Sequence, residues 1–372
     1  MSYAFADKAT PTRCDLELRE KNLRACFHGE RLIKRYAFLT LGTPMQLKQC
    51  ITAALMICMA QAYAEPVLPS PEFSVRWLDE AYLPRHQALV KASNAFAAES
   101  KTFCAATTEK NLATTRNAWK KTALAWHAMD AAPGGPIILE RTGRKIDFWP
   151  TRPDDIEAMI PKGLDERNVG ARGLPAAEYL LWGNGEPKAQ LAKLKAKERC
   201  LYLVGISERI VSDIALLNDG WGYYREQLGA ENPFFRQNLL AETLNLMLGA
   251  LDSQAKRLPK EASRTAFAEW RSGTGKASSM AVLNAIDNTL FSPGGGIGIL
   301  LADKPDIITK VKQALSNAKS AQASIPEAFD SPAASAARSH YLASIKQLKH
   351  SIETDVAEAL DLTLGLSESD GD

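Results

Sequence analysis

Long stretches of this sequence repeat apolar residues at intervals of three and four, which is the spacing of one face of an α-helix. The clearest stripes consist of Leu203, Ile206, Ile210, Ile214 and Leu217, and of Tyr341, Ile345, Leu348, Ile352, Val356 and Leu360. From residue 70 onward no alternating polar and apolar pattern predicts a strand. We therefore expect an all-α protein in which both stripes are core faces and not ligand sites.

Long helical segments joined by short loops build helical bundles. We expect helices near 71–104, 108–130, 175–184, 190–228, 234–257, 277–291, 303–322 and 333–363. Two long segments rich in Pro and Gly, 131–173 and 292–298, interrupt them, and loops of this kind often carry function. The segment 292–298 lacks the Lys-Ser/Thr of a phosphate-binding loop, so we expect a turn between helices whose glycines adopt positive φ.

Residues 45–64 have the three parts of a secretory signal peptide: Lys48, an uncharged run from Cys50 to Ala60, and a small-x-small site ending at Ala64. The apolar run is shorter than the roughly 20 residues that a membrane-spanning helix needs. We expect cleavage between Ala64 and Glu65, export to the periplasm or cell envelope, and no integral membrane segment. A buried core helix is the alternative.

Residues 1–44 precede this signal peptide, which begins with its own methionine, Met45. We expect translation to start there, which makes 1–44 a gene-model extension or a disordered leader. The whole 372-residue chain has a formal charge of +2, but the 308 residues after Ala64 carry 36 Lys and Arg against 38 Asp and Glu, a charge of −2. A charge this close to zero argues against a nucleic-acid partner.

Six cysteines occur in the whole chain, and two of them, Cys104 and Cys200, follow the leader. In an exported protein they are a candidate disulfide, because exported compartments are oxidising. Two separate buried thiols fit the sequence as well, since spacing along the chain does not show proximity in space.

The segment 172–183 has the sequence features of a helix N-terminus. It reads Arg-Gly-Leu-Pro-Ala-Ala-Glu-Tyr-Leu-Leu-Trp-Gly. Gly173 can shape the first turn, Pro175 suits it, and Glu178 lies one turn further on the same face. This segment resembles the Gly-x-His-x-x-Glu signature of the imelysin family, with Pro175 in the place of the histidine. Further stretches agree with the family in the same order: Trp119, Trp126, Asp130, Gly135–Ile137, Asp147–Pro150, Glu269–Ser272, Asn284 and Gly296–Leu300.

The resemblance spans about residues 72–362 and implies two helical bundles, near 72–228 and 232–362, related by duplication. It also implies an exported protein with a role in iron homeostasis, acting with iron-uptake components of the envelope or with a small ligand. Some members are described as metallopeptidases, in which the motif's His and Glu bind metal or act in catalysis. Pro175 has no metal-binding atom, so only Glu178 carries over.

A zinc peptidase needs three protein ligands and an open position for water. The histidines after the leader, His86, His127, His340 and His350, show no His-Glu-x-x-His spacing. We therefore expect no catalytic residue and a binding or iron-homeostasis accessory factor. The alternatives are an imelysin-type metallopeptidase with a rearranged site and a helical scaffold that docks an envelope partner.

Three hypotheses describe the site. In the first, the carboxylates of Asp130, Asp147 and Glu178 converge on iron or another divalent cation. Glu178 and Asp130 are then the candidate ligands, and His127 takes the place of the missing histidine. In the second hypothesis, Glu178 pairs with Arg172, Arg144 or Arg152 and so fastens the loop to the bundle. The third hypothesis is a small-ligand pocket between helices. The expected pocket residues are Trp126, Asp130, Asp147, Trp149, Arg152, Arg172, Gly173, Pro175 and Glu178.

Overall fold

The computed structural model describes residues 68–365, except residues 133, 186 and 262. The predicted signal peptide at 45–64, its cleavage site and the stretch 1–44 lie outside the described residues. Within the described part the chain forms helices and turns and no strand, which confirms the all-α class. None of the helices described combines the length and the apolar character needed to cross a bilayer.

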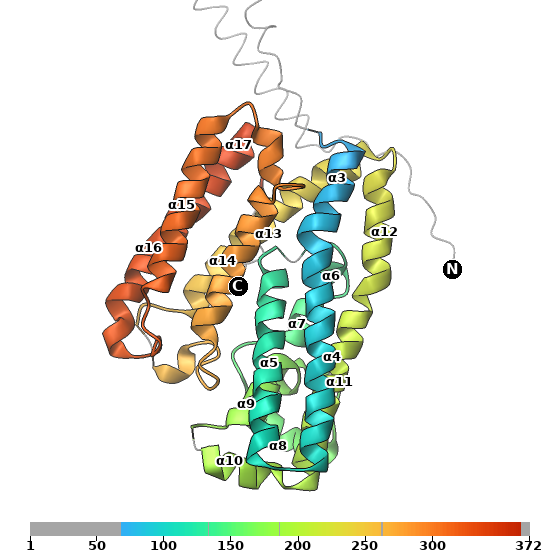
Figure 1. The fold of residues 1–372 in the computed structure, drawn as a ribbon, viewed down its shortest axis with the longest axis vertical. Coiled ribbons are helices and arrows are strands. Elements are labelled where there is room, and N and C mark those ends of the chain that lie inside the picture. The colour runs from blue at the N-terminus through green and yellow to red at the C-terminus, as the bar shows by residue number, and fades with distance from the viewer. Residues whose placement is uncertain (1–67, 133, 186, 262, 366–372) are drawn as a thin grey trace, which may run out of the picture. The chain divides into compact units, whose positions relative to one another are not determined.

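Three long helical rods make up the first half of the described chain (Figure 1). The first rod joins α3 (Pro71–Trp77), the π-helical turn η1 (Leu78–Tyr82) and α4 (Leu83–Ala105). The second is α5 (Glu109–Asp130), and the third joins α11 (Lys197–Ala215) to α12 (Leu217–Gly229). Both α5 and α11 pack against α4, so the three rods share one apolar core.

Local sequence signals explain where these rods begin. The Ser70 side chain accepts a hydrogen bond from the backbone N–H of Phe73 at 3.1 Å, and Pro71 occupies the first turn of α3. Thr108 accepts one from the N–H of Asn111 at 3.2 Å and so caps α5. Side-chain caps of this type satisfy N–H groups that the helix leaves unpaired, and each contributes about 1 kcal/mol.

A disulfide between Cys104 and Cys200 joins the end of α4 to the start of α11. The two Cα atoms lie 5.6 Å apart. The structure therefore brings together the two cysteines that the sequence left as either a pair or two separate thiols.

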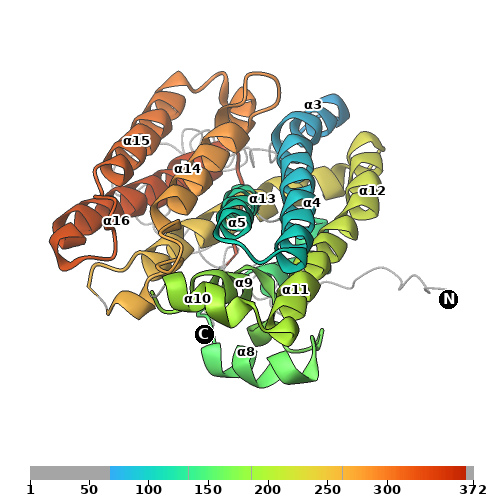
Figure 2. The same cartoon turned by 60° about the horizontal axis from the view of Figure 1, so that its bottom comes forward.

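The second half of the described chain contains α13 (Pro233–Arg257), α14 (Gly275–Phe291), α15 (Pro305–Ala323) and α16 (Ser335–His350). The last rod continues through η7 (Ser351–Val356) and α17 (Ala357–Ala359), and three short 3-10 turns occur at η4 (Arg264–Ala266), η5 (Ile297–Leu301) and η6 (Pro332–Ala334). Helix α14 packs on α15 and also on α5, so it links the two halves (Figure 2). The division near residue 230 and the duplication stay predictions.

The expectation of one helix over 190–228 is wrong. The segment contains α10 (Pro187–Leu194), α11 and α12, with a turn at 195–196 and a one-residue break at Leu216. Ile214 and Leu217 on either side of Leu216 are both buried, so the apolar stripe continues across the break. Apolar spacing alone therefore does not detect it.

The segment 131–173 is also more ordered than the irregular loop that its Pro and Gly content predicts. It contains α6 (Pro136–Leu139), α7 (Thr142–Ile146), α8 (Pro153–Met159) and the 3-10 turns η2 (Ile160–Lys162) and η3 (Val169–Ala171). Ile137, Ile146 and Ile156 are each buried, so α6, α7 and α8 are each anchored in the core. Elements this short are too brief to show a helical period in the sequence.

The glycines of 292–298 are not explained by positive φ, as the sequence led us to expect, since none of the four has such an angle. Close packing explains them instead. A Cβ atom on Gly295 would lie 2.9 Å from the Cα of Trp77, and one on Gly294 would collide with the carboxylate of Glu80. The turn after α14 therefore needs glycine because it is pressed against α3 and η1.

Candidate functional site

The motif segment forms helix α9 (Gly173–Trp182), as the resemblance implies. Gly173 has a φ of 78°, and a Cβ atom there would lie 2.9 Å from the carbonyl oxygen of Lys145. Pro175 is buried in the first turn, and Glu178 follows one turn later, 2% exposed. The indole N–H of Trp119 donates to the Leu174 carbonyl at 3.1 Å and ties α9 to α5.

Glu178 binds a backbone group instead of an arginine. Its carboxylate accepts a hydrogen bond from the N–H of Ser272 at 2.9 Å, in the turn that precedes α14. Burial, followed by the negative charge of Glu269, raises the pKa of Glu178 to about 7. The predicted pairing of Glu178 with Arg172, Arg144 or Arg152 is therefore wrong, although Glu178 does fasten the motif helix to a second segment.

Arg172 and Arg152, both predicted pocket residues, have other roles. The Arg172 guanidinium is buried and forms an ion pair with Asp213 on α11. Arg152 is exposed, lies 3.8 Å from a carboxylate oxygen of Asp155 and rests over the Phe148 ring. The sequence could not identify these partners, because Asp213 is 41 residues away from Arg172.

Five charged or titratable side chains from four segments surround the ends of α5 and α13, and we call them the His127 cluster. Its members are His127, Asp130, Asp147, Arg257 and Glu269. His127 Nε2 lies 2.5 Å from Glu269 Oε1, and a guanidinium nitrogen of Arg257 lies 2.5 Å from Asp147 Oδ2. Glu269 has a φ of 55°, a left-handed conformation that residues other than glycine seldom adopt.

Electrostatics divides the His127 cluster into charged pairs. Burial opposes ionisation of the His127–Glu269 pair, but mutual attraction outweighs it, so the pKa of His127 is raised and that of Glu269 is lowered. Loss of solvation raises the pKa of the half-buried Asp130, in spite of Arg257 and His127 nearby. The cluster therefore contains two charged pairs and a carboxyl group, Asp130, that holds its proton more readily than usual.

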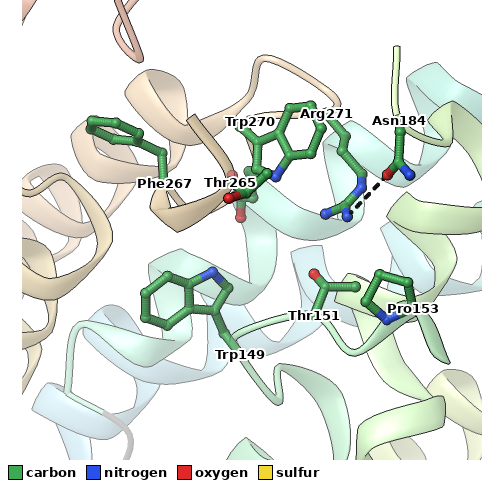
Figure 3. A pocket seen from close by; sticks show the side chains of 9 residues that line it. Trp149, Thr151, Pro153, Asn184, Thr265, Phe267, Trp270 and Arg271 are labelled. Atoms are coloured by element: carbon green, nitrogen blue, oxygen red, sulfur yellow. Dashed lines mark hydrogen bonds between the residues drawn. The ribbon is translucent and has the colours of Figure 1, made fainter. Parts of the chain in front are cut away.

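An open cavity of about 580 Å³ lies beside this cluster (Figure 3). The residues that line it are Trp149, Thr151, Pro153, Asn184, Thr265, Phe267, Glu269, Trp270 and Arg271. A second cavity of about 280 Å³ is lined by Asp130, Gly143, Arg144, Asp147, Phe148, Trp149, Ser253 and Arg257. The segment 267–271 thus connects the motif helix, the His127 cluster and the larger cavity.

The structure brings three of the nine predicted pocket residues to these cavities. Trp149 lines both cavities, and Asp130 and Asp147 line the smaller one. The other six predicted residues line neither, and these are Trp126, Arg152, Arg172, Gly173, Pro175 and Glu178. Glu178 and Arg172 are buried and bonded within the fold, Glu178 to the Ser272 N–H and Arg172 to Asp213.

Arg257, Glu269 and Arg271 were missed as site residues. A signal was present for Glu269 and Arg271, since the stretch Glu269–Ser272 matches the family's second-half pattern. No feature of the sequence marks Arg257, which is the last residue of a long helix.

The metal that the family motif implies does not fit the motif residues here. Pro175 offers no donor atom, and Glu178 is the only ligand type that remains. The donor set that does converge consists of His127, Asp130 and Asp147, one ligand atom from each lying within 4.8 Å of the others. One imidazole and two carboxylates suit iron or zinc. Arg257 competes with such an ion for Asp147.

Comparisons with known proteins agree with this fold. The imelysin family model, peptidase family M75, matches residues 82–354. An iron-regulated protein A precursor from Parabacteroides distasonis ATCC 8503 superposes with a TM-score of 0.68 at 17% identity, covering 80% of this chain and 96% of that one. An imelysin-like protein from Psychrobacter arcticum 273-4 gives a TM-score of 0.65 at 15% identity, covering 81% and 100%.

No curated protein matches the chain. The two solved structures are similar in fold alone, since fewer than one residue in five is identical. The match of the family model covers most of the chain, including the motif helix and the segment 267–271. The chain belongs to the imelysin family.

Proposed function

We propose that this protein is an exported binding factor of the cell envelope that serves iron homeostasis and does not cleave peptides. Its export is supported by the signal-peptide pattern of residues 45–64. The iron role is supported by family membership and by the description of a similar fold as an iron-regulated protein. Binding is assigned to the larger cavity.

The observation that carries this proposal is the open cavity of about 580 Å³ between the 149–153 segment and the 265–271 segment. Its volume lies within the range of about 300–1,000 Å³ that is typical of small-molecule sites. It is lined by residues that the family pattern includes, Trp149 on one side and Glu269 to Arg271 on the other.

The motif helix argues against a peptidase. A catalytic zinc site needs three protein ligands and a bound water that the metal activates. Pro175 stands in the place of the motif's histidine, and the carboxylate of Glu178 accepts a hydrogen bond from the N–H of Ser272. The motif helix therefore does not supply the ligand set of a catalytic zinc site.

Filling the cavity tests the proposal. Thr265 is exposed and lines the cavity, so Thr265→Trp places an indole in the ligand's space. In a strain that lacks the chromosomal copy, we expect the wild-type gene to restore growth under iron limitation and Thr265→Trp to fail. Thr309→Trp, at an exposed position of α15, is the matched control and should restore growth. Equal growth with both variants contradicts the proposal.

Export has a separate test. Mass spectrometry of the N-terminus of the native protein should find Glu65 as the first residue of the mature chain. A peptide from residues 1–44 in the mature protein contradicts both the cleavage and the start at Met45.

A second candidate function, divalent cation binding, is favoured by the convergence of His127, Asp130 and Asp147. The ion would be cargo, and the three side chains would hold it while Arg257 shifts away from Asp147. Calorimetric titration with Fe²⁺ and Zn²⁺ should show binding that Asp130→Asn weakens at least tenfold. Glu178→Ala and the exposed Asp303→Asn should leave it unchanged. Equal binding by all the variants contradicts this assignment.

A further inference from the structure

The larger cavity has aromatic walls. Trp149 lies on one side, and Trp270 and Phe267 lie on the other (Figure 3). Trp149 is half-buried, so part of its ring is free to contact a ligand. Three aromatic side chains around one space favour a ligand with a flat apolar part. A pair of aromatic rings contributes about 0.5–1.5 kcal/mol of stabilisation beyond that of the apolar surface it buries.

The second feature of the cavity is Arg271, whose guanidinium group points into it. Its one hydrogen bond to a described residue is a long one, 3.4 Å from Nη2 to the side-chain oxygen of Asn184. Its Nε atom is buried and has no hydrogen-bond partner within the part of the chain that the structure describes. No described carboxylate lies within the 4.0 Å of an ion pair with this guanidinium. An arginine has five N–H donors, so most of the donors of Arg271 are free.

Arg271 is held in place by stacking. The guanidinium carbon lies 4.5 Å from the ring centre of Trp270 and 5.5 Å from that of Tyr179. Burial lowers the pKa of Arg271, and the charge of Glu178 opposes that effect. A guanidinium that is positioned by aromatic rings and not by an acid is preorganised to accept an anionic group from outside.

Trp270 supplies another free donor at the same place. The residue is 7% exposed, its ring nitrogen is buried without a hydrogen-bond partner among the described residues, and Figure 3 shows that nitrogen on the side that faces the cavity. Guanidinium groups of Arg264 and Arg271 lie over the ring at 5.2 and 4.5 Å. The N–H edge is therefore the part of Trp270 that remains for a ligand.

Glu269, the acidic residue in the cavity wall, does not accept hydrogen bonds from Arg271 or Trp270. Glu269 accepts hydrogen bonds from His127 on one oxygen and from Ser278 on the other, both at 2.5 Å. Glu269 therefore leaves the donors of Arg271 and Trp270 without an acid partner. Such donors match an acceptor with a negative charge, and a planar carboxylate fits the fork of an arginine.

We propose that the larger cavity binds an aromatic carboxylate, whose carboxylate is held by Arg271 and the Trp270 N–H and whose ring packs against Trp149. This assignment rests on the proposed function, because it names the class of ligand for the same cavity. It adds a chemical criterion, since a neutral analogue of the same shape should bind poorly.

The test uses 2-naphthoate as the probe and its neutral analogue 2-naphthamide as the ligand control. Isothermal titration of the full mature chain should show saturable binding of the naphthoate at one site, and binding of the amide at least tenfold weaker. Arg271→Gln should weaken naphthoate binding by about tenfold to a hundredfold, because a charged hydrogen-bonding partner is lost. Trp149→Leu should weaken it by about tenfold.

Arg225→Gln is the matched control, since Arg225 is exposed and pairs with Asp79 outside the cavity. It should change the affinity less than twofold. Thermal unfolding of each variant checks that the fold is intact, and Arg271→Lys, which keeps the charge without the planar fork, should bind with intermediate affinity if folding is not the cause.

Three results would overturn the inference: no saturable binding of naphthoate, equal affinity for the amide, or an equal effect of Arg271→Gln and Arg225→Gln. The cavity-filling variant separates this failure from that of the proposed function. If naphthoate does not bind but Thr265→Trp still prevents growth, the ligand class is wrong and the cavity remains the functional site. If naphthoate binds and Thr265→Trp supports growth, the ligand class stands and the role in iron homeostasis is wrong.

Discussion

Two arginines near the motif helix, Arg172 and Arg271, differ in what surrounds them. Arg172, at the start of α9, is 2% exposed, pairs with the buried Asp213 and donates to the carbonyl of Glu166 at 3.0 Å. Arg271, beside Glu178, is half-buried, stacks on rings and donates one long bond to Asn184.

The difference distinguishes an arginine that stabilises the fold from an arginine that is available to bind a ligand. A buried guanidinium with a carboxylate partner is costly to leave alone, so removing the partner destabilises the fold. A guanidinium whose donors are unfilled contributes little to the fold through hydrogen bonds, so its removal should be felt mainly by the ligand. Sequence alone ranks Arg172 above Arg271, because Arg172 adjoins the motif.

The largest effect is expected for Asp213→Ala. Asp213 is completely buried and lies between Arg172 and Arg209, so the change leaves a buried arginine without its acid. We expect a loss of about 3–5 kcal/mol in the free energy of unfolding, measured by urea denaturation. Asp303→Ala, at an exposed turn, should lose less than about 0.5 kcal/mol. A loss below about 1 kcal/mol for Asp213→Ala would remove the distinction between the two arginines.

The next effect concerns Glu178, the carboxylate whose charge acts on Arg271. Burial, then the charge of Glu269, raises its pKa from 4.5 to about 7 in the folded protein. Between these values the folded state keeps a proton that the unfolded state releases, so this group's contribution to stability falls as the pH rises. The fall amounts to about 3 kcal/mol and is complete above the folded pKa.

Glu178→Gln keeps an oxygen for the Ser272 N–H and removes the titration. The difference in unfolding free energy, variant minus wild type, should therefore rise by about 3 kcal/mol from pH 4.5 to pH 8. Urea denaturation at a series of pH values measures it, and the exposed Glu353→Gln serves as the control. Parallel pH profiles for wild type and Glu178→Gln would contradict the raised pKa of Glu178.

The smallest effect is expected for Arg271→Ala. No described carboxylate depends on it within ion-pair distance, so its removal should change the free energy of unfolding by less than about 1 kcal/mol. Thermal denaturation of the ligand-free protein measures the change. A destabilisation comparable with that of Asp213→Ala would place Arg271 among the structural arginines and would weaken its assignment to the ligand.

Apolar spacing was sufficient to predict most of the fold. It located the long helices to within a few residues, because each buries a continuous stripe such as Leu203 to Leu217. It did not detect the break at Leu216 or the short helices of 131–173, because the stripe passes through the first and the others are shorter than three turns.

The site was harder to predict than the fold. Trp149, Asp130 and Asp147 were predicted from one segment of the chain, but the residues that line the cavities with them, Arg257, Glu269 and Arg271, come from beyond residue 250. Asp147 and Arg257 lie 110 positions apart and His127 and Glu269 lie 142 positions apart, and no local spacing encodes contacts over such separations. The departure at Pro175 could be read directly from the sequence, because proline has no donor atom for a metal.

The disulfide between Cys104 and Cys200 has a consequence for limited proteolysis. It spans 96 positions, and α5, the segment 131–173 and the motif helix all lie between its two ends. A single protease cut anywhere in that interval leaves two pieces that migrate as one band on a non-reducing gel and as two after reduction. A nicked but unreduced protein therefore keeps the Trp149 side of the cavity covalently tied to its scaffold.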